Sequence, residues 1–139
     1  SHFVELEKHA RIMPMICQLE LHPLNTKKEV REYCKEHGIL VMAHTPTGRM
    51  CEKIRENTAL QDLARTHKKK IAQIIIRWHY QNHVIPVVAT KSPVHMCENL
   101  DIFDFSLSEE EMQMVEAQNE GYVMLPGNGI DDPNYIYNL

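Results

Sequence analysis

Three short apolar runs, rich in β-branched residues, stand out along the chain. They cover residues 15–21, 38–43 and 84–90, and each is bounded by a turn signal or a helix stop. Runs of this length and composition predict β-strands. The first run alternates only partly and the other two hardly at all. That pattern is typical of parallel strands that are buried on both faces.

Amphipathic stretches between these runs predict helices. Thr26 opens a Thr-Lys-Lys-Glu capping box, and Gly38 is a natural stop for the helix that follows it. A longer helix is predicted from near Leu60 or Lys68 to Asn82. Its apolar positions share one face at helical spacing: Ile71, Ile74, Ile75 and Trp78.

Two further helices are predicted after the third run. Ser92 followed by Pro93 indicates an N-cap with proline at the first helical position. A second capping box spans residues 108–111, and its three glutamates complement the helix dipole. Strands that alternate with helices predict an α/β fold with a parallel sheet. Residues 121–139, rich in Gly, Pro and Tyr, are predicted to be an irregular tail that docks through its aromatics or frays.

The composition excludes several classes of protein. A chain of 139 residues with 43% apolar content can form one domain or a piece of a larger one. The net charge of -4 disfavours nucleic-acid binding, which needs a basic surface. No stretch is long and apolar enough for a membrane span, and residues 1–5 lack the features of a signal peptide.

The cysteines and histidines give no strong metal signal. The four cysteines lie far apart, without a CxxC pair: Cys17, Cys34, Cys51 and Cys97. This pattern predicts reduced thiols and a cytoplasmic protein. His79 and His83 are four residues apart on a predicted helix, but no HExxH frame accompanies them, which favours solvated or capping histidines over a metal site. The basic run at residues 68–70 is predicted to be a solvated helix start.

Several segments, taken in order, resemble the aldo-keto reductase family. They are Gln-Leu-Glu-Leu-His-Pro at 18–23, Tyr-Cys-Lys-Glu-His-Gly-Ile at 33–39, Ala-Gln at 72–73 with Arg-Trp at 77–78, Val-Ile-Pro at 84–86, Glu-Asn-Leu at 98–100 and Phe-Asp-Phe-Ser-Leu-Ser at 103–108. The resemblance covers residues 1–120. It implies part of a (β/α)₈ barrel of the TIM type, with the last three parallel strands and their surrounding helices, followed by the tail at 121–139.

The resemblance also implies a function. The family reduces aldehydes and ketones with NADPH, and its catalytic Asp, Tyr, Lys and His lie on earlier barrel strands, so none of them can be placed in this sequence. Because carbonyl reduction needs a general acid as well as a hydride donor, we expect this chain to supply the cofactor-binding half and to be inactive alone. Three strands cannot close a barrel. Their bare edges favour self-association or pairing with a complementing N-terminal half.

Two other interpretations remain open. The chain could be a non-catalytic truncated remnant that binds a nucleotide or a protein through its strand edges or its Tyr-rich tail. A flavodoxin-like sheet is disfavoured, because no Gly-rich loop that could cradle a phosphate follows the first strand.

The resemblance implies nine cofactor-binding residues and no metal ligand. Gln18 would bond the nicotinamide carboxamide, and His44 takes the place of the family's aromatic residue that stacks on the nicotinamide. Thr45 and Thr47 would keep the loop near the pyrophosphate polar. The structural alternatives are a barrel-interior glutamine satisfied by its neighbours and a plain turn after the second strand.

The remaining residues of this set would hold the adenosine end of NADPH. Lys91 and Ser92 precede a helix N-terminus, where backbone amides and the dipole attract an anion such as the ribose 2′-phosphate. His95 stands where the family often has Arg, and it is a weaker phosphate partner near neutral pH. Glu98 and Asn99 would contact the adenine. The alternatives are a simple N-cap with a solvated lysine and a polar pair on a helix surface.

Overall fold

The computed structural model describes residues 2–124, and its centre is a parallel sheet of three strands in the order β1-β2-β3. β1 (Ile16–Glu20) pairs with β2 (Leu40–His44), which also pairs with β3 (Val84–Pro86). All three predicted strands are confirmed. The third is shorter than predicted, because the chain leaves the sheet soon after β3.

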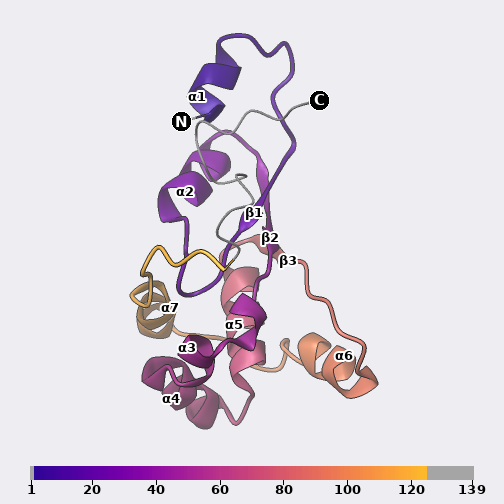
Figure 1. Ribbon diagram of the computed structural model, residues 1–139, viewed down its shortest axis with the longest axis vertical. Coiled ribbons are helices and arrows are strands. Elements are labelled where there is room, and N and C mark those ends of the chain that lie inside the picture. Colours follow the sequence, from indigo (N-terminus) through magenta and orange to yellow (C-terminus); the bar gives the residue numbers. More distant parts are fainter. Residues whose placement is uncertain (1, 125–139) are drawn as a thin grey trace.

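Helices surround this sheet, as Figure 1 shows. They are α1 (His2–Glu7), α2 (Lys28–Glu36), the 3₁₀ turn η1 (Gly48–Met50), α3 (Glu52–Arg55), α4 (Thr58–His67), α5 (Ile71–Gln81), α6 (Pro93–Leu100) and α7 (Glu109–Glu116). Helix α5 contacts β3, α4, α6 and α7, so it joins the sheet to the other helices. In Figure 1, α3, α4 and α7 lie together at the lower left, whereas α6 stands apart at the end of a long connection from β3.

Three predicted helix ends are confirmed. The Ser92 hydroxyl accepts the His95 N–H at the start of α6, with Pro93 at the first helical position. At the start of α7, Ser108 and Glu111 form the reciprocal capping box. After α2, Gly38 adopts a left-handed φ of 68°, a conformation in which glycine ends a helix without steric cost.

One helix start differs from the prediction, and the structure decides a second start that the prediction left open. Thr26 caps nothing, because it is buried and its N–H donates to Asn119 Oδ1 at 3.1 Å, so α2 begins only after Lys27. The longer helix was predicted to start near Leu60 or near Lys68, and the structure supports the start near Lys68. Lys68 adopts a left-handed φ of 54° and ends α4, and α5 then starts at Ile71 in a new direction.

One face of the sheet is packed and the other is open. Val41 and Ala43 are 5% and 0% exposed, whereas Ile16 and Leu40, on the opposite face, are 49% and 54% exposed. The prediction of strands buried on both faces is therefore wrong for residues 2–124, because no layer among them covers the second face. The packed face meets α5 and its neighbours in a core in which each large side chain contributes roughly 1.5–3 kcal/mol: Leu21, Leu24, Ile54, Leu60, Ile74, Ile75 and Trp78.

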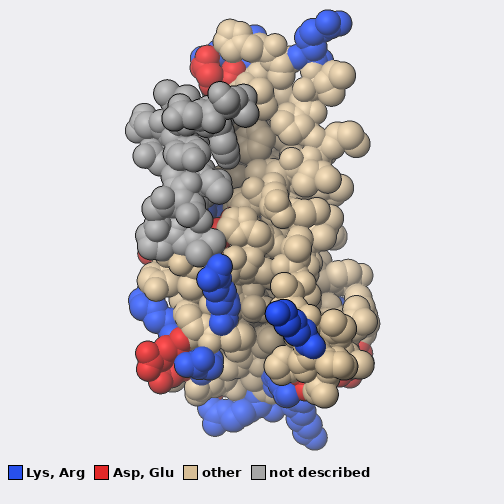
Figure 2. Space-filling view, turned by 45° about the vertical axis from the view of Figure 1, so that its right-hand side comes forward, with Lys and Arg blue, Asp and Glu red and all other residues tan. Residues whose placement is uncertain are grey.

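The open face is apolar and is flanked by unpaired strand edges. Ile85 on β3 is 43% exposed, and within residues 2–124 both outer strands, β1 and β3, have a neighbour on one side only, as predicted. In Figure 2 charged side chains are sparse over the upper part of the molecule, and Lys and Arg gather at the lower end, where Figure 1 has α3, α4 and α6. Exposed apolar faces and free edges of this kind favour contact with another layer of protein.

The segment after α7 returns to the carboxyl end of the sheet. The N–H groups of Glu120 and Tyr122 both donate to the Leu24 carbonyl, at 3.0 and 2.9 Å. The Met124 N–H donates to Glu20 Oε1 at 2.6 Å. The first four residues of the predicted tail therefore dock through backbone hydrogen bonds and through Met124, which packs against the core, and the rest of it, residues 125–139, lies outside the described residues.

Candidate functional site

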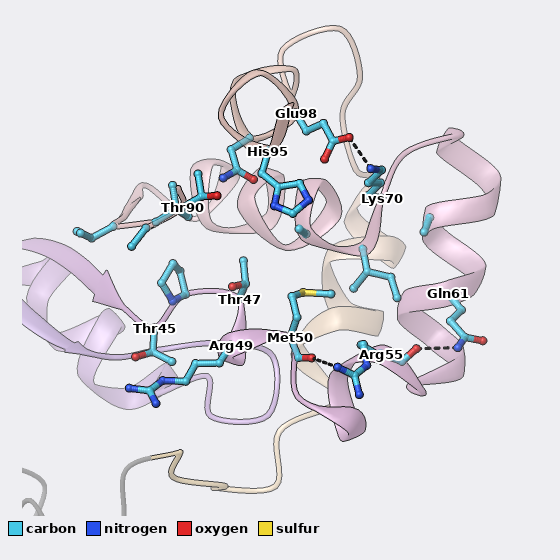
Figure 3. Close-up of a pocket in the computed structure, with 18 of the residues that line it drawn as sticks. Thr45, Thr47, Arg49, Met50, Arg55, Gln61, Lys70, Thr90, His95 and Glu98 are labelled. Carbon is cyan, nitrogen blue, oxygen red and sulfur yellow. Dashed lines mark hydrogen bonds and ion pairs between the residues drawn. The ribbon is translucent and has the colours of Figure 1, made fainter. Parts of the chain in front are cut away.

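A cavity of about 1070 Å³ opens at the end of the sheet where the carboxyl termini of the strands lie. It is enclosed by the loop after β2, the connection after β3, the start of α5 and one face of α6. In Figure 3, Thr45 and Thr47 lie on one side of this space, with His95 and Glu98 on the other. The structure thus brings together five of the nine residues expected to bind a cofactor: Thr45, Thr47, His95, Glu98 and Asn99.

The other four expected residues lie outside the cavity lining. Gln18 is exposed on the open sheet face, where its Nε2 donates to Met42 Sδ at 3.5 Å, and His44 directly precedes the first lining threonine. Lys91 and Ser92 directly follow Thr90, which lines the cavity. Ser92 is engaged in capping α6, and Lys91 is exposed.

The loop at residues 45–50 has an uncommon backbone conformation. Its non-glycine residues Thr45, Arg49 and Met50 have φ values of 53°, 51° and 48°. A left-handed conformation costs roughly 1–2 kcal/mol for such residues. Hydrogen bonds from Gly48 N to Thr45 O at 2.9 Å and from Met50 N to Thr47 O at 3.0 Å hold the loop. Strain of this kind concentrates at ligand-binding sites, which agrees with the place of the loop on the cavity wall.

Basic side chains that sequence reasoning missed also line the cavity. They are Arg49, Arg55, Arg65 and Lys70, and Glu98 is the one carboxylate among the described lining residues. Arg55 donates to the Met50 carbonyl at 3.1 Å, and Lys70 forms an ion pair with Glu98. The excess of positive charge favours an anionic ligand. These residues come from separate segments of the chain, so no local motif could have revealed them.

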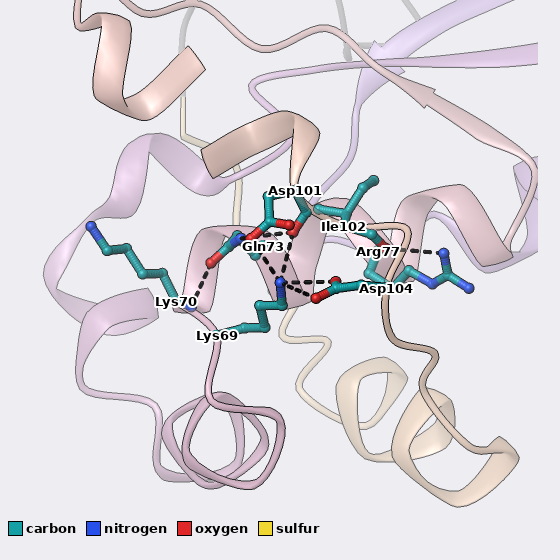
Figure 4. Close-up of polar contacts among 7 residues, drawn as sticks. All are labelled: Lys69, Lys70, Gln73, Arg77, Asp101, Ile102 and Asp104. Carbon is teal, nitrogen blue, oxygen red and sulfur yellow. Dashed lines mark hydrogen bonds and ion pairs between the residues drawn. The ribbon is translucent and has the colours of Figure 1, made fainter. Parts of the chain in front are cut away.

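A polar network attaches the end of α6 to α5, as Figure 4 shows. Lys69 Nζ lies 2.8 Å from carboxylate oxygens of both Asp101 and Asp104. These hydrogen bonds raise the pKa of Lys69, and the same contact with Lys69 lowers the pKa of Asp104. The Lys69 side chain is only 10% exposed, so the prediction of a solvated helix start is wrong for this residue.

Two further contacts complete this attachment. The Gln73 side chain donates to the Asp101 carbonyl at 2.8 Å, and Arg77 Nη1 donates to the Ile102 carbonyl at 3.0 Å. The segment that follows α6 is therefore bound to α5 through both backbone and side chains (Figure 4). This network fixes the wall of the cavity that carries His95 and Glu98.

Comparison with known proteins identifies the family. Residues 1–120 match the family model described as "Aldo/keto reductase family". The chain belongs to the aldo/keto reductase family. Its three-stranded sheet with the surrounding helices is therefore part of the (β/α)₈ barrel of aldo/keto reductases, as predicted.

Aldo/keto reductase relatives are similar to this chain over less than half of their own length. Glyoxal reductase of Bacillus subtilis is 41% identical over 119 residues, which cover 86% of this chain and 42% of that protein. The 9,11-endoperoxide prostaglandin H2 reductase of Trypanosoma cruzi is 38% identical over 120 residues, with the same two shares.

Solved aldo/keto reductase structures give the same correspondence. MGS-M4, an aldo-keto reductase enzyme from a Medee basin deep-sea metagenome library, superposes with a TM-score of 0.83 at 30% identity. The superposition covers 88% of this chain and 45% of that one. A variant of Gox0644 crystallised in complex with NADPH gives a TM-score of 0.78 at 30% identity, over 85% of this chain and 43% of that one.

The histidines and cysteines of this aldo/keto reductase chain form no metal centre within residues 2–124, where no group of three or more potential ligands is present. The four cysteines are free. His79 and His83 do not share a helix face, because α5 ends at Gln81. His79 is fully buried, so the expectation of a solvated or capping histidine is wrong for it. None of the described helices has the length and apolar character of a membrane span.

Proposed function

We propose that this chain is the cofactor-binding half of a cytoplasmic, NADPH-dependent reductase of small aldehydes or ketones. The observation that carries the proposal is the cavity, in which Thr45 and Thr47 face His95 and Glu98 across a space lined by basic side chains. A dinucleotide with three phosphate groups is the kind of ligand that such a lining favours.

Different residues of the cavity would bind different parts of the ligand. The polar loop at 45–47, together with the cations on its rim, would hold the pyrophosphate. Lys91, Ser92 and His95 surround the N-terminus of α6, where the helix dipole and the Lys91 ammonium group would attract the ribose 2′-phosphate. Glu98 and Asn99, farther along α6, would contact the adenine.

The nicotinamide end would lie toward the open sheet face. Gln18 and His44 point to that face, because the strand register places them on the same side as the exposed Ile16 and Leu40. The Gln18 amide would fix the nicotinamide carboxamide, and the His44 ring would stack on it. When bound, NADPH supplies the hydride. The residues assigned here orient it and hold its phosphates.

The proton for carbonyl reduction is assigned to another part of the barrel. None of the nine residues assigned here serves as the general acid, and the open face around Ile16, Leu40 and Ile85 is the surface that a complementing half of the barrel would cover. The matched relatives and solved structures extend well beyond the length of this chain, which supports this division.

A titration tests the cofactor half. Isothermal titration of the 139-residue chain with NADPH and with NADH is expected to give micromolar binding and a preference for NADPH. Lys91→Gln should weaken NADPH binding and leave NADH binding unchanged, because only NADPH carries the 2′-phosphate. Lys35→Gln, an exposed lysine on α2 away from the cavity, is the matched control. Absence of binding up to millimolar NADPH would refute the proposal.

A complementation experiment tests the reaction. The chain is mixed with a separately produced amino-terminal half of the Bacillus subtilis glyoxal reductase, and NADPH oxidation is followed with a small aldehyde. Activity is expected in the mixture and in neither half alone. If the two halves associate and bind NADPH but do not oxidise it, the assignment to carbonyl reduction is wrong.

The open apolar face favours one other candidate, a non-catalytic protein-binding module. Its exposed Ile16, Leu40 and Ile85 would then bind a partner without any reaction. Light scattering of the chain alone and mixed with the amino-terminal half tests this surface. Association without reductase activity favours the protein-binding module, whereas a chain that stays monomeric in both samples contradicts both candidates.

A further inference from the structure

His79 is a polar residue at a position where the helix pattern predicts a buried apolar side chain. It lies on α5 next to Trp78, and both side chains are completely enclosed. Burying an imidazole without a specific partner is costly, so a histidine here needs a reason beyond packing. The metal-site interpretation does not supply one, because within residues 2–124 no set of potential ligands converges.

The partner of His79 is the loop at residues 45–50. His79 Nε2 lies 3.0 Å from the carbonyl oxygen of Pro46, which is itself buried. A carbonyl can only accept, so Nε2 carries the hydrogen and donates it. Burial, with Arg31 and His22 as lesser causes, lowers the pKa of His79 to about 3, so the ring is neutral at ordinary pH.

The bonded carbonyl lies between two residues of the cavity wall. Thr45 and Thr47 flank Pro46 and line the cavity, while His79 approaches from the core. Pro46 has no N–H of its own. The backbone hydrogen bonds within the loop join Gly48 to Thr45 and Met50 to Thr47, whereas the Pro46 carbonyl is bonded by His79 of α5. This loop keeps three non-glycine residues in the left-handed region, and such a conformation persists only when its surroundings hold it.

We propose that His79 is a positioning residue for dinucleotide binding: its hydrogen bond to Pro46 holds Thr45 and Thr47 at the cavity wall in the geometry that receives the phosphates. The inference rests on the proposed function for the identity of the ligand. The attachment of the loop to α5 does not depend on that identity.

Three substitutions of His79 distinguish a role in positioning the loop from a contribution to core packing. His79→Leu removes the donor at similar volume. His79→Gln offers an amide nitrogen at about the reach of Nε2, whereas His79→Asn carries its amide nitrogen too near the backbone to reach Pro46. Ile75→Val, on the same helix and fully buried, is the control for general loss of core packing.

The first measurement is amide hydrogen exchange of Gly48 and Met50, whose N–H groups close the loop, compared with amides in the middle of α5. In His79→Leu and His79→Asn the two loop amides should exchange about tenfold faster, with no matching change in α5, and His79→Gln should restore them. In Ile75→Val, loop and helix amides should change together. A uniform change in His79→Leu, as in the control, would overturn the proposal. Should the Leu variant fail to fold, the comparison of Gln with Asn decides.

The second measurement is NADPH binding by the same variants in the intact chain. His79→Leu and His79→Asn should weaken it about tenfold, and His79→Gln should bind within about threefold of the natural chain. A loosened loop with unchanged NADPH affinity would also overturn the proposal. If the natural chain binds no NADPH, the proposed function fails, and hydrogen exchange alone then decides whether His79 positions the loop.

Discussion

Lys70 at the start of α5 forms an ion pair with Glu98 on α6, across the rim of the cavity. A lysine at a helix N-cap cannot accept a hydrogen bond from the first turn, so its side chain contributes through Glu98 rather than through capping. The pair joins a basic side chain to the carboxylate expected to contact the adenine.

Lys70→Gln should weaken NADPH binding by about two- to fivefold, which is the range for an exposed ion pair. The substitution removes one positive charge from the rim and leaves Glu98 without this partner, so a more anionic ligand loses more affinity. NADH, with one phosphate fewer, should be affected less. Parallel titrations of both dinucleotides check this, with Lys35→Gln as control. Equal losses for both ligands would show that Lys70 acts on the structure and not on the phosphate.

Gly48→Ala should destabilise the chain by about 2 kcal/mol or more. A Cβ at Gly48 would lie 3.0 Å from Met124 Cε and 3.1 Å from Ile54 Cγ1, and φ is +56°. Gly38→Ala is the matched control, because Gly38 has a φ of +68° but no atom within 4 Å of its added Cβ. Urea unfolding measures both, and the excess for Gly48 reports the steric contact. Equal losses of stability in the two variants would mean that the Met124 and Ile54 side chains move aside without lowering the free energy of unfolding.

Stability should fall as the pH drops below about 6.5, the ordinary pKa of histidine. The folded-state pKa of His79 is lowered to about 3, so the unfolded chain binds a proton that the folded chain excludes between these values. The resulting loss approaches about 1.4 kcal/mol per pH unit for one histidine. Burial also lowers the pKa of His22, so His22 contributes a loss in the same direction.

Unfolding of the natural chain and His79→Gln at several pH values between 7 and 4 separates these contributions. His22 is present in both proteins, so the difference in slope reports His79. The Gln variant should show the shallower dependence. Identical slopes for the natural chain and the His79 variant would contradict the assignment.

The Lys69 network should stabilise the chain above the ordinary pKa of Asp, about 3.9. Contact with Lys69 lowers the pKa of Asp104, so this contribution is present above the unfolded value and is lost as the pH falls through the lowered value. Asp104→Asn should lower the melting temperature at pH 6 and should make it less dependent on pH in the acid range. Asp62→Asn, in an exposed pair with Arg65, is the control. An unchanged melting temperature for Asp104→Asn at pH 6 would show that the Lys69–Asp104 pair does not stabilise the chain.

Local chemistry was sufficient to predict most elements of the fold. The strands followed from apolar runs, and the starts of α6 and α7 followed from Ser92 and Ser108, since these signals act within a few residues. The capping box predicted at Thr26 is wrong, because the Thr26 N–H donates to the distant Asn119 and not to a side chain in the first turn of α2. The break at Lys68 carries no Gly or Pro, so the sequence left open whether the helix starts near Leu60 or near Lys68.

The candidate site was predictable only where resemblance or a local motif pointed to it. Thr45, Thr47 and the helix start at Ser92 belong to continuous segments. Arg55 and Arg65 reach the cavity only because α3 packs against α4 and α4 packs against α5, which no local pattern reveals. His79 is polar in an apolar stripe, and that mismatch was the one signal in the sequence of its contact with Pro46.

The most direct test of the account is a gain of affinity at His95. His95 lines the cavity near the start of α6, where the family often has an arginine, and a permanently charged guanidinium would bond the 2′-phosphate in two places. Calorimetric titration of His95→Arg should show NADPH binding strengthened by about tenfold and NADH binding unchanged. Equal affinities of the variant and the natural chain for NADPH, or equal gains for both dinucleotides, would contradict the assignment of this cavity to the NADPH phosphates.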